Sequence, residues 1–197
     1  LKVLKSAPVI MCWVFFFFSA MGQVGLMTFT PTLMHEIYSF ELQAAGAFVS
    51  VMIGAVMFGV LCGGYLGDVF RKPDVVVTVG YLVGAGLVAA IWHFEQSSWL
   101  LYGIFAFVGF LYGVVFPSRE LLIRAATPKG ASGRVFGFVY SGMDFGAALI
   151  PVVFGWLVDN GIPRTAFLCV AILWILSVIV MLMTNAATKK HAIAVPE

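Results

Sequence analysis

Charged residues are scarce in this chain of 197 residues: Lys, Arg, Asp and Glu make up 10% of it, against about 25% in ordinary soluble domains. Hydrophobic residues make up 62%. A soluble domain of this size cannot bury so much apolar surface in one core, so the composition excludes an ordinary water-soluble protein. The apolar residues also fall in long runs that recur about every 30 residues. The sequence therefore predicts an integral membrane protein in contact with a lipid bilayer.

Groups that carry out chemistry are also few. The three cysteines stand alone within apolar runs, at no spacing that suits a metal or a redox pair. The three histidines fall in expected loops or in the C-terminal tail, without metal-like neighbours. Basic and aromatic residues do not form the mixed patches that bind nucleic acid. We expect no metal, no cofactor and no nucleic-acid partner. We also expect no enzyme activity, since an enzyme in the membrane needs clustered polar catalytic groups.

Six apolar runs are each long enough to cross the bilayer, which takes about 20 residues of helix. They are continuous rather than alternating, so the spans are helices and the fold class is an all-α membrane protein. We expect one six-helix bundle over residues 1–184 and a cytoplasmic tail over residues 185–197. The expected spans cover residues 7–33, 44–66, 75–92, 99–122, 135–158 and 165–184.

The placement of charge predicts the orientation of the chain. With six spans both termini lie on one side of the membrane, and that side receives all of the Lys and Arg residues except Arg164. Because basic residues favour the cytoplasmic side, both termini are expected in the cytoplasm. The opposite loops carry acidic residues, namely Glu36, Glu41, Glu95 and Asp159.

One polar stretch, GGYLGDVFRKPD at residues 63–74, gathers four charged residues between the second and third spans. It resembles the pattern G-x-L-x-D-R-x-G-R-R of the major facilitator superfamily, which follows the second helix of each six-helix half. Glycines permit a sharp reversal, and the basic residues hold such a loop at the cytoplasmic surface. The residues that carry this resemblance are Gly64, Leu66, Asp68, Arg71 and Lys72.

This copy of the pattern is degenerate, because Val69 and Pro73 stand where the family commonly has basic residues. Degenerate copies are typical of the second half of such transporters, so the resemblance implies helices seven to twelve. Three further stretches are similar to segments of that half: FTPTL at residues 29–33, GASGRVFGF at 130–138 and GMDFGAALIPVVFGWLVDNG at 142–161.

The resemblance implies secondary active transport of a small solute by alternating access, as a symporter or an antiporter. We expect it to be linked to protons and to occur in the inner (plasma) membrane of a bacterium. A membrane-embedded enzyme and a passive channel or scaffold with six spans are the alternatives. Because the family binds substrate between two six-helix halves, and the chain begins at Leu1, we expect a fragment whose N-terminal half is missing. A homodimer of half-transporters is the alternative.

The candidate substrate pathway contains the one ionisable residue expected near mid-bilayer, Asp144. Tyr140 and Ser141 share its helical face, and Asp144 is the candidate for carrying a proton. The alternative role for Asp144 is hydrogen bonding between helices. Gln23 and Thr30 on the first span, with Ser19, can donate hydrogen bonds to a substrate or to a neighbouring helix. Tyr112 on the fourth span is a further candidate.

The candidate cytoplasmic gate combines the loop after the second span with the inner end of the fourth. Glu120 is expected to meet Arg71 or Lys72 when the gate closes. The alternative is that these residues anchor the helix ends at the membrane surface. The complete set of loop and gate residues is Gly64, Gly67, Asp68, Arg71, Lys72, Arg119 and Glu120.

Overall fold

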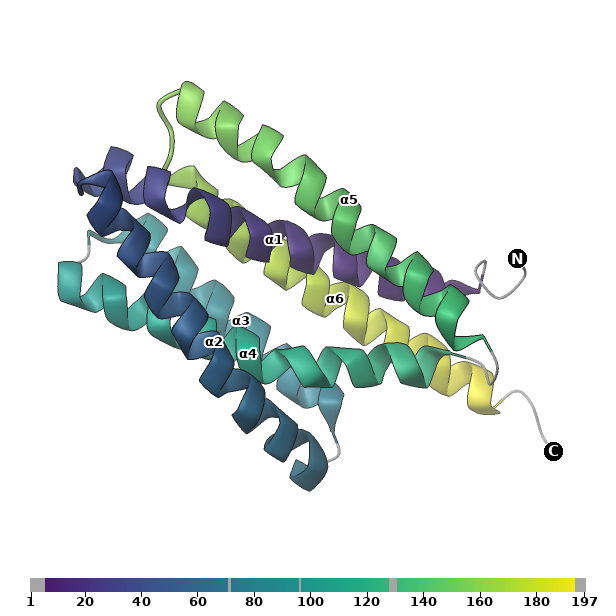
Figure 1. Ribbon diagram of the computed structural model, residues 1–197. Helices are drawn as coiled ribbons and strands as arrows, with labels where there is room; N and C mark the ends of the chain where they lie inside the picture. Colours follow the sequence, from purple (N-terminus) through teal and green to yellow (C-terminus); the bar gives the residue numbers. More distant parts are fainter. Residues whose placement is uncertain (1–5, 71, 96, 128–130, 194–197) are drawn as a thin grey trace.

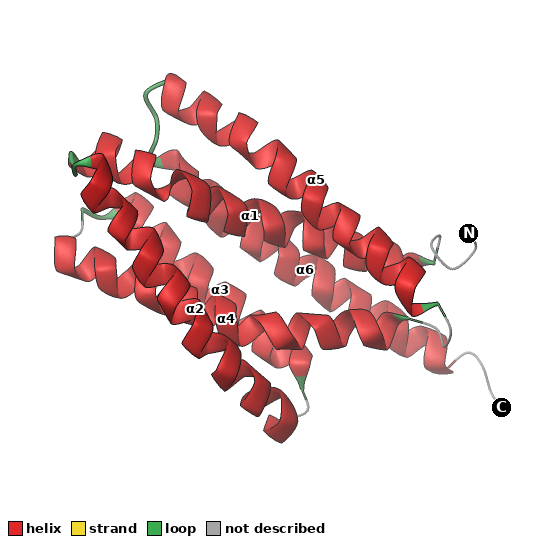
Figure 2. Cartoon of the chain, viewed as in Figure 1, coloured by secondary structure: helices red, strands yellow, loops and turns green. Residues whose placement is uncertain are grey.

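A computed structural model describes residues 6–70, 72–95, 97–127 and 131–193, with only the backbone described for Asp68, Phe70, Ala126 and residues 185–193. These residues form six α-helices and no strand (Figures 1 and 2). Every helix contains an apolar stretch long enough to cross a membrane. The predicted all-α membrane fold with six spans is therefore confirmed. The helices are α1 (Ala7–Tyr38), α2 (Leu42–Phe70), α3 (Pro73–His93), α4 (Ser98–Ala126), α5 (Ser132–Asp159) and α6 (Thr165–Ile193).

Local chemistry accounts for several helix ends. Prolines occupy the first turn of α1 and of α3, where a missing backbone N–H costs nothing. At the end of α1, Ser39 adopts the left-handed conformation, with φ 57°, and its N–H donates to the carbonyl of His35. Gly161, with φ 70°, reverses the chain after α5. The apolar part of α6 ends at Thr184, and the helix continues to Ile193.

The helices pack in two groups that face each other. α1 packs against α5 and α6, whereas α2 packs against α4, and α3 lies between α4 and α6. Neighbours in sequence contact little in three cases: α2 with α3, α4 with α5, and α5 with α6. The start of α1 and the end of α6 lie at the same end of the bundle (Figure 1).

Glycines make the tightest helix contacts. A Cβ atom at Gly59 or Gly63 of α2 would overlap a backbone carbonyl oxygen of α4, and one at Gly142 of α5 would lie 2.7 Å from the carbonyl oxygen of Trp13. Small residues permit such close approach in membranes, where lipid supplies no hydrophobic drive for helices to associate.

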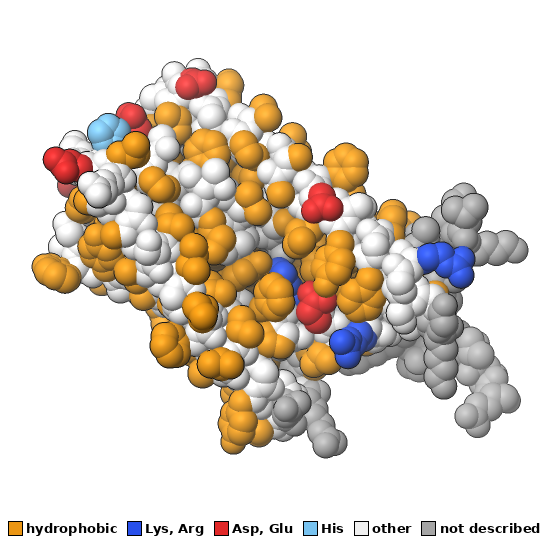
Figure 3. Space-filling model, viewed as in Figure 1, with side chains coloured by type: hydrophobic (Ala, Val, Ile, Leu, Met, Phe, Trp, Pro, Cys, Tyr) orange, Lys and Arg blue, Asp and Glu red, His pale blue; other side chains and the backbone are white. Residues whose placement is uncertain are grey.

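The outer surface is largely apolar. The side chains of Leu61 and Trp99 are 73% and 86% exposed, and hydrophobic side chains cover much of the face in Figure 3. Such a surface is compatible with lipid contact and not with water.

Candidate functional site

A buried cation lies within the bundle. Arg119 of α4 is only 3% exposed, and its Nη1 donates a 2.9 Å hydrogen bond to the hydroxyl oxygen of Tyr112, two turns earlier. Its guanidinium carbon lies 5.2 Å from the ring centroid of Phe16, 5.4 Å from that of Tyr112 and 4.4 Å from that of Phe116. Aromatic faces stabilise a guanidinium where water cannot reach it. This part of the bundle therefore holds a positive charge among aromatic rings.

Glu120 supplies the negative charge beside this cation. Its Oε1 lies 3.8 Å from Nε of Arg119, and its Oε2 accepts a 2.7 Å hydrogen bond from the hydroxyl of Tyr140 on α5. This bond joins two helices that otherwise contact each other little. The carboxylate thus connects the Arg119 region to α5.

Several polar groups around Arg119 are buried without a hydrogen-bond partner among the described residues. On α1 these are the Ser19 hydroxyl and both amide atoms of Gln23, one turn apart. The hydroxyl of Tyr81 on α3 lies close to Ser19 and to Arg119, but no hydrogen bond of standard geometry joins them. Polar groups buried in this way are costly in a packed core, and they are typical of sites that receive water or a ligand.

The residues predicted to share one face of α5 differ in their exposure to the surroundings of the bundle. Asp144 is exposed and lies near the middle of the helix, whereas Tyr140 and Ser141 are partly buried. Ser141 accepts a 3.1 Å hydrogen bond from Nε1 of Trp13 and donates to the carbonyl of Phe138. Asp144 takes part in no ion pair among the described residues. The structure therefore directs Tyr140 and Ser141 to neighbouring helices and Asp144 outward.

The candidates on α1 are both buried. Gln23 is 5% exposed, and the Thr30 hydroxyl donates to the carbonyl of Leu26 on its own helix. The structure brings Tyr112, Arg119, Glu120 and Tyr140 together, but it leaves Asp144 apart from that group.

The stretch of residues 63–74 that resembles the family pattern is described only in part, and most of it is helical, since α2 continues to Phe70 and α3 begins at Pro73. Within α2, Gly64 faces open space, and a Cβ atom at Gly67 would be in ordinary contact with Leu121 of α4. Lys72 is exposed at the start of α3. Arg71 and the side chain of Asp68 lie outside the described residues. The pairing of Glu120 with Arg71 or Lys72 stays a prediction, while the described partners of Glu120 are Arg119 and Tyr140.

Sequence reasoning missed Tyr81, Phe16 and Phe116 as neighbours of Arg119. All three stand in continuous apolar runs, where an aromatic residue is the ordinary choice for a core. The only available signal was the hydroxyl of Tyr81, which needs a partner when it is buried in the middle of a span. No group of three metal-ligating side chains occurs within the described part of the chain.

A family model described as Major Facilitator Superfamily matches residues 12–197. The chain belongs to the major facilitator superfamily. The predicted family is thus confirmed, and with it membrane transport as the general function of the proteins to which this chain is related.

The similar curated members of the superfamily are distant and longer. The multidrug resistance protein MdtG of Proteus mirabilis is 24% identical over 189 residues, which are 92% of this chain and 47% of that protein. MdtG of Yersinia enterocolitica is 24% identical over 152 residues, or 76% and 36% of the two chains. The MFS-type transporter YttB of Bacillus subtilis is 24% identical over 160 residues, or 81% and 39%. The chain therefore spans less than half the length of these relatives.

Proposed function

We propose that this chain is the C-terminal half, helices seven to twelve, of a transporter that moves a small solute across a bacterial inner membrane. The transport is secondary and active, proceeds by alternating access, and is linked to protons. The observation that carries this proposal is the exposed carboxylate of Asp144 in the middle of α5.

A carboxylate in that position cannot face lipid without cost. Placing an acidic side chain at the centre of a bilayer costs about 2.5–3.5 kcal/mol, and such residues almost always face protein or a water-filled cavity. The face of α5 that carries Asp144 is therefore suited to a second six-helix bundle with an aqueous pathway between the two. The matches, which cover 36% and 47% of two relatives, agree with one such bundle.

The candidate residues of the proposed transporter have three different roles. Asp144 faces the space between the halves and exchanges the coupled proton, since it is the exposed acid at mid-span. The buried group around Arg119, which includes Tyr112, Glu120 and Tyr140, connects α4 to α5. Substrate hydrogen bonds come from Gln23, Thr30 and Ser141 when the pathway opens.

The cytoplasmic position of both termini is supported by charge. The exposed basic residues Lys72, Arg124 and Arg134 lie at helix ends on the side of the termini, whereas Arg164 pairs with Glu95 between the opposite loops, at 3.9 Å. This asymmetry is the one that the positive-inside rule describes.

The name of MdtG makes lipophilic drugs a reasonable first class of probe, and ethidium can be followed by fluorescence. The test uses the full-length transporter that contains this chain, with ethidium efflux driven by an imposed pH gradient. Asp144→Asn removes the carboxylate proposed to bind the coupled proton, so efflux should lose its dependence on the gradient. Asp159→Asn, the same change at the exposed end of α5, should leave it intact. Unchanged gradient dependence in Asp144→Asn would remove this residue from proton coupling.

A further inference from the structure

The guanidinium of Arg119 has an edge that no hydrogen bond occupies. Its Nη1 donates to Tyr112, but its Nε has no hydrogen-bond partner among the described residues. The carboxylate oxygen beside it, Oε1 of Glu120, lies 3.8 Å from Nε, which is too far for a hydrogen bond, and this oxygen is also unpartnered within the described part of the chain. The opposite charges are therefore close, but the N–H on this edge is left for another acceptor.

The hydroxyl groups of Tyr81 and Ser19 extend this polar region. Both are buried without a hydrogen-bond partner among the residues that the structure describes, and Tyr81 lies close to both Ser19 and Arg119. Each hydroxyl can donate one hydrogen bond, as can Nε of Arg119. The region thus offers several donors and a positive charge, which together are complementary to an acceptor that carries a negative charge.

Aromatic rings around Arg119 suit an aromatic body on that acceptor. Phe16 is 1% exposed and closes the site toward α1, whereas Phe116 is 40% exposed, with its centroid 4.4 Å from the guanidinium carbon. The site therefore reaches the surroundings of the bundle past Phe116. The face in Figure 3 is hollowed near its centre, where a basic side chain shows beside an acidic one among hydrophobic side chains.

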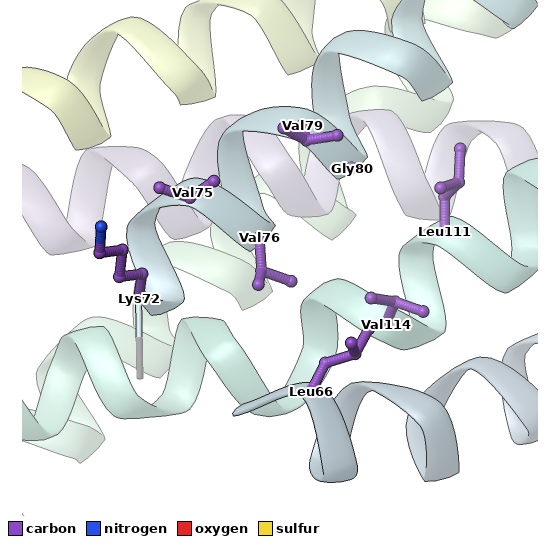
Figure 4. A pocket seen from close by; sticks show the side chains of 8 residues that line it. All are labelled: Leu66, Lys72, Val75, Val76, Val79, Gly80, Leu111 and Val114. Carbon is purple, nitrogen blue, oxygen red and sulfur yellow. The ribbon is translucent and has the colours of Figure 1, made fainter. Parts of the chain in front are cut away.

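The groove between α2, α3 and α4, with a volume of about 280 Å³, is not suited to such a ligand (Figure 4). Its walls are aliphatic side chains and glycine, except for Lys72, whose ammonium points away from the groove. It therefore offers an anion neither a charge nor a side-chain hydrogen-bond donor. The Arg119 region has both.

We propose that Arg119 binds the carboxylate of an organic anion with an aromatic body, as a second class of solute for the transporter. The carboxylate accepts a hydrogen bond from Nε of Arg119 in place of the long contact with Glu120, while Glu120 keeps its bond from Tyr140. The aromatic body lies against Phe116. Tyr140 is one helical turn from Asp144, so the site borders the face of α5 that the proposed function gives to the pathway. The route of the solute to this site rests on the proposed function, whereas its binding does not.

Three compounds of similar shape and different charge test the site: benzoate is negative, benzamide is neutral and benzamidine is positive. Equilibrium binding of each radiolabelled compound is measured on the full-length transporter that contains this chain, purified in mild detergent and without a pH gradient. Benzoate should bind saturably, and the other two should bind at least about tenfold more weakly, since they lack the charge-assisted hydrogen bond. Ethidium is a cation and not a ligand of this site, so its efflux tests the proposed function independently.

Two variants identify the residues that receive the carboxylate. Arg119→Lys keeps the charge but loses the planar donor edge, so it should weaken benzoate binding about tenfold. Glu120→Gln can still accept the bond from Tyr140 but removes the competing negative charge, so it should strengthen binding about tenfold. Arg134→Gln, which removes an exposed cation at the start of α5, is the control and should bind benzoate as the unaltered transporter does.

Equal binding of the three compounds overturns the assignment to an anion, as does the absence of saturable benzoate binding. Equal affinity in Arg119→Lys and Arg134→Gln overturns the role of Arg119. Affinity that falls or stays the same in Glu120→Gln overturns the exchange of carboxylates. Because an unfolded variant cannot bind more tightly, this last measurement decides the question even if Arg119→Lys does not fold. Benzoate binding with the expected effects supports the site even if efflux proves independent of the pH gradient, a result that would contradict only the proposed function.

Discussion

The positive charge of the Arg119 guanidinium is stabilised inside an apolar bundle by several partners. Three aromatic rings lie within 5.4 Å of the guanidinium carbon, Tyr112 accepts a hydrogen bond, and Glu120 supplies the opposite charge at 3.8 Å. Removing one member of a buried pair leaves the other without compensation, which is more harmful than replacing both. Arg119 is therefore expected to contribute to stability, whatever role it has in transport.

Replacing Arg119 by Met should lower the free energy of unfolding by about 1.5–3 kcal/mol, the usual contribution of a hydrogen bond to a charged group. Met preserves volume but leaves Glu120 and Tyr112 without their partner. Thermal unfolding in detergent, followed by loss of helical circular dichroism, measures the effect. Arg134→Met, an exposed cation at the start of α5, is the matched control and should change little. Equal midpoints for the two variants would show that the buried pair does not stabilise the fold.

Helices of this bundle pair through glycine rather than through interlocking large side chains. α2 and α4 approach so closely that glycines on one meet backbone atoms of the other, at Gly59 with Gly113 and at Gly63 with Val114. Dispersion contacts and close backbone approach hold membrane helices together, since lipid tails compete equally well for apolar surface. The contact between α2 and α4 should therefore be sensitive to a single added methyl group.

Gly63→Ala should separate α2 from α4 and destabilise the bundle by about 1–3 kcal/mol, as overpacking does in well-packed cores. Gly64→Ala changes the next residue of the same helix, where nothing lies within 4 Å of the added atom. That variant should be neutral or stabilising by up to about 1 kcal/mol, because Ala favours a helix more than Gly does. Resistance to detergent-induced unfolding compares the two. If both variants were equally stable, the α2–α4 contact would be looser than the structure describes.

The pattern of residues in the sequence predicted which segments form helices better than it predicted which helices pack together. Long apolar runs were sufficient to predict six spans. The periodicity of residue types along a helix indicates which face packs against protein, but not which helix packs against that face. The packing of α2 against α4 could therefore not be predicted. The described partners of Glu120, Arg119 on its own helix and Tyr140 on α5, could not be predicted for the same reason, and its expected pairing with Arg71 or Lys72 stays a prediction. Asp144 was identified by its depth, which needs only hydropathy, but its outward direction needed the structure.

Over the whole molecule, burial is uneven. α2 and α5 are the least buried of the six spans, whereas α1 is the most buried. The exposed side of α5 combines large apolar residues, such as Phe145 and Val152, with the carboxylate of Asp144. Lipid suits the first kind of residue and penalises the second. This face of α5 is best suited to packing against a second helical bundle, with water near Asp144. The described bundle has no further helices to pack there.

Transport should therefore require a second half. Cells that lack endogenous ethidium efflux would express this chain alone, a six-helix N-terminal half of the same transporter alone, or both from separate genes. Neither half alone should lower ethidium accumulation, because the proposed pathway lies between them, whereas co-expression should restore efflux and the two halves should purify together. Equal amounts of this chain in the membrane, measured by immunoblot, make the comparison valid. Robust efflux by this chain alone would instead favour a homodimer of half-transporters, in which a second copy covers the α5 face.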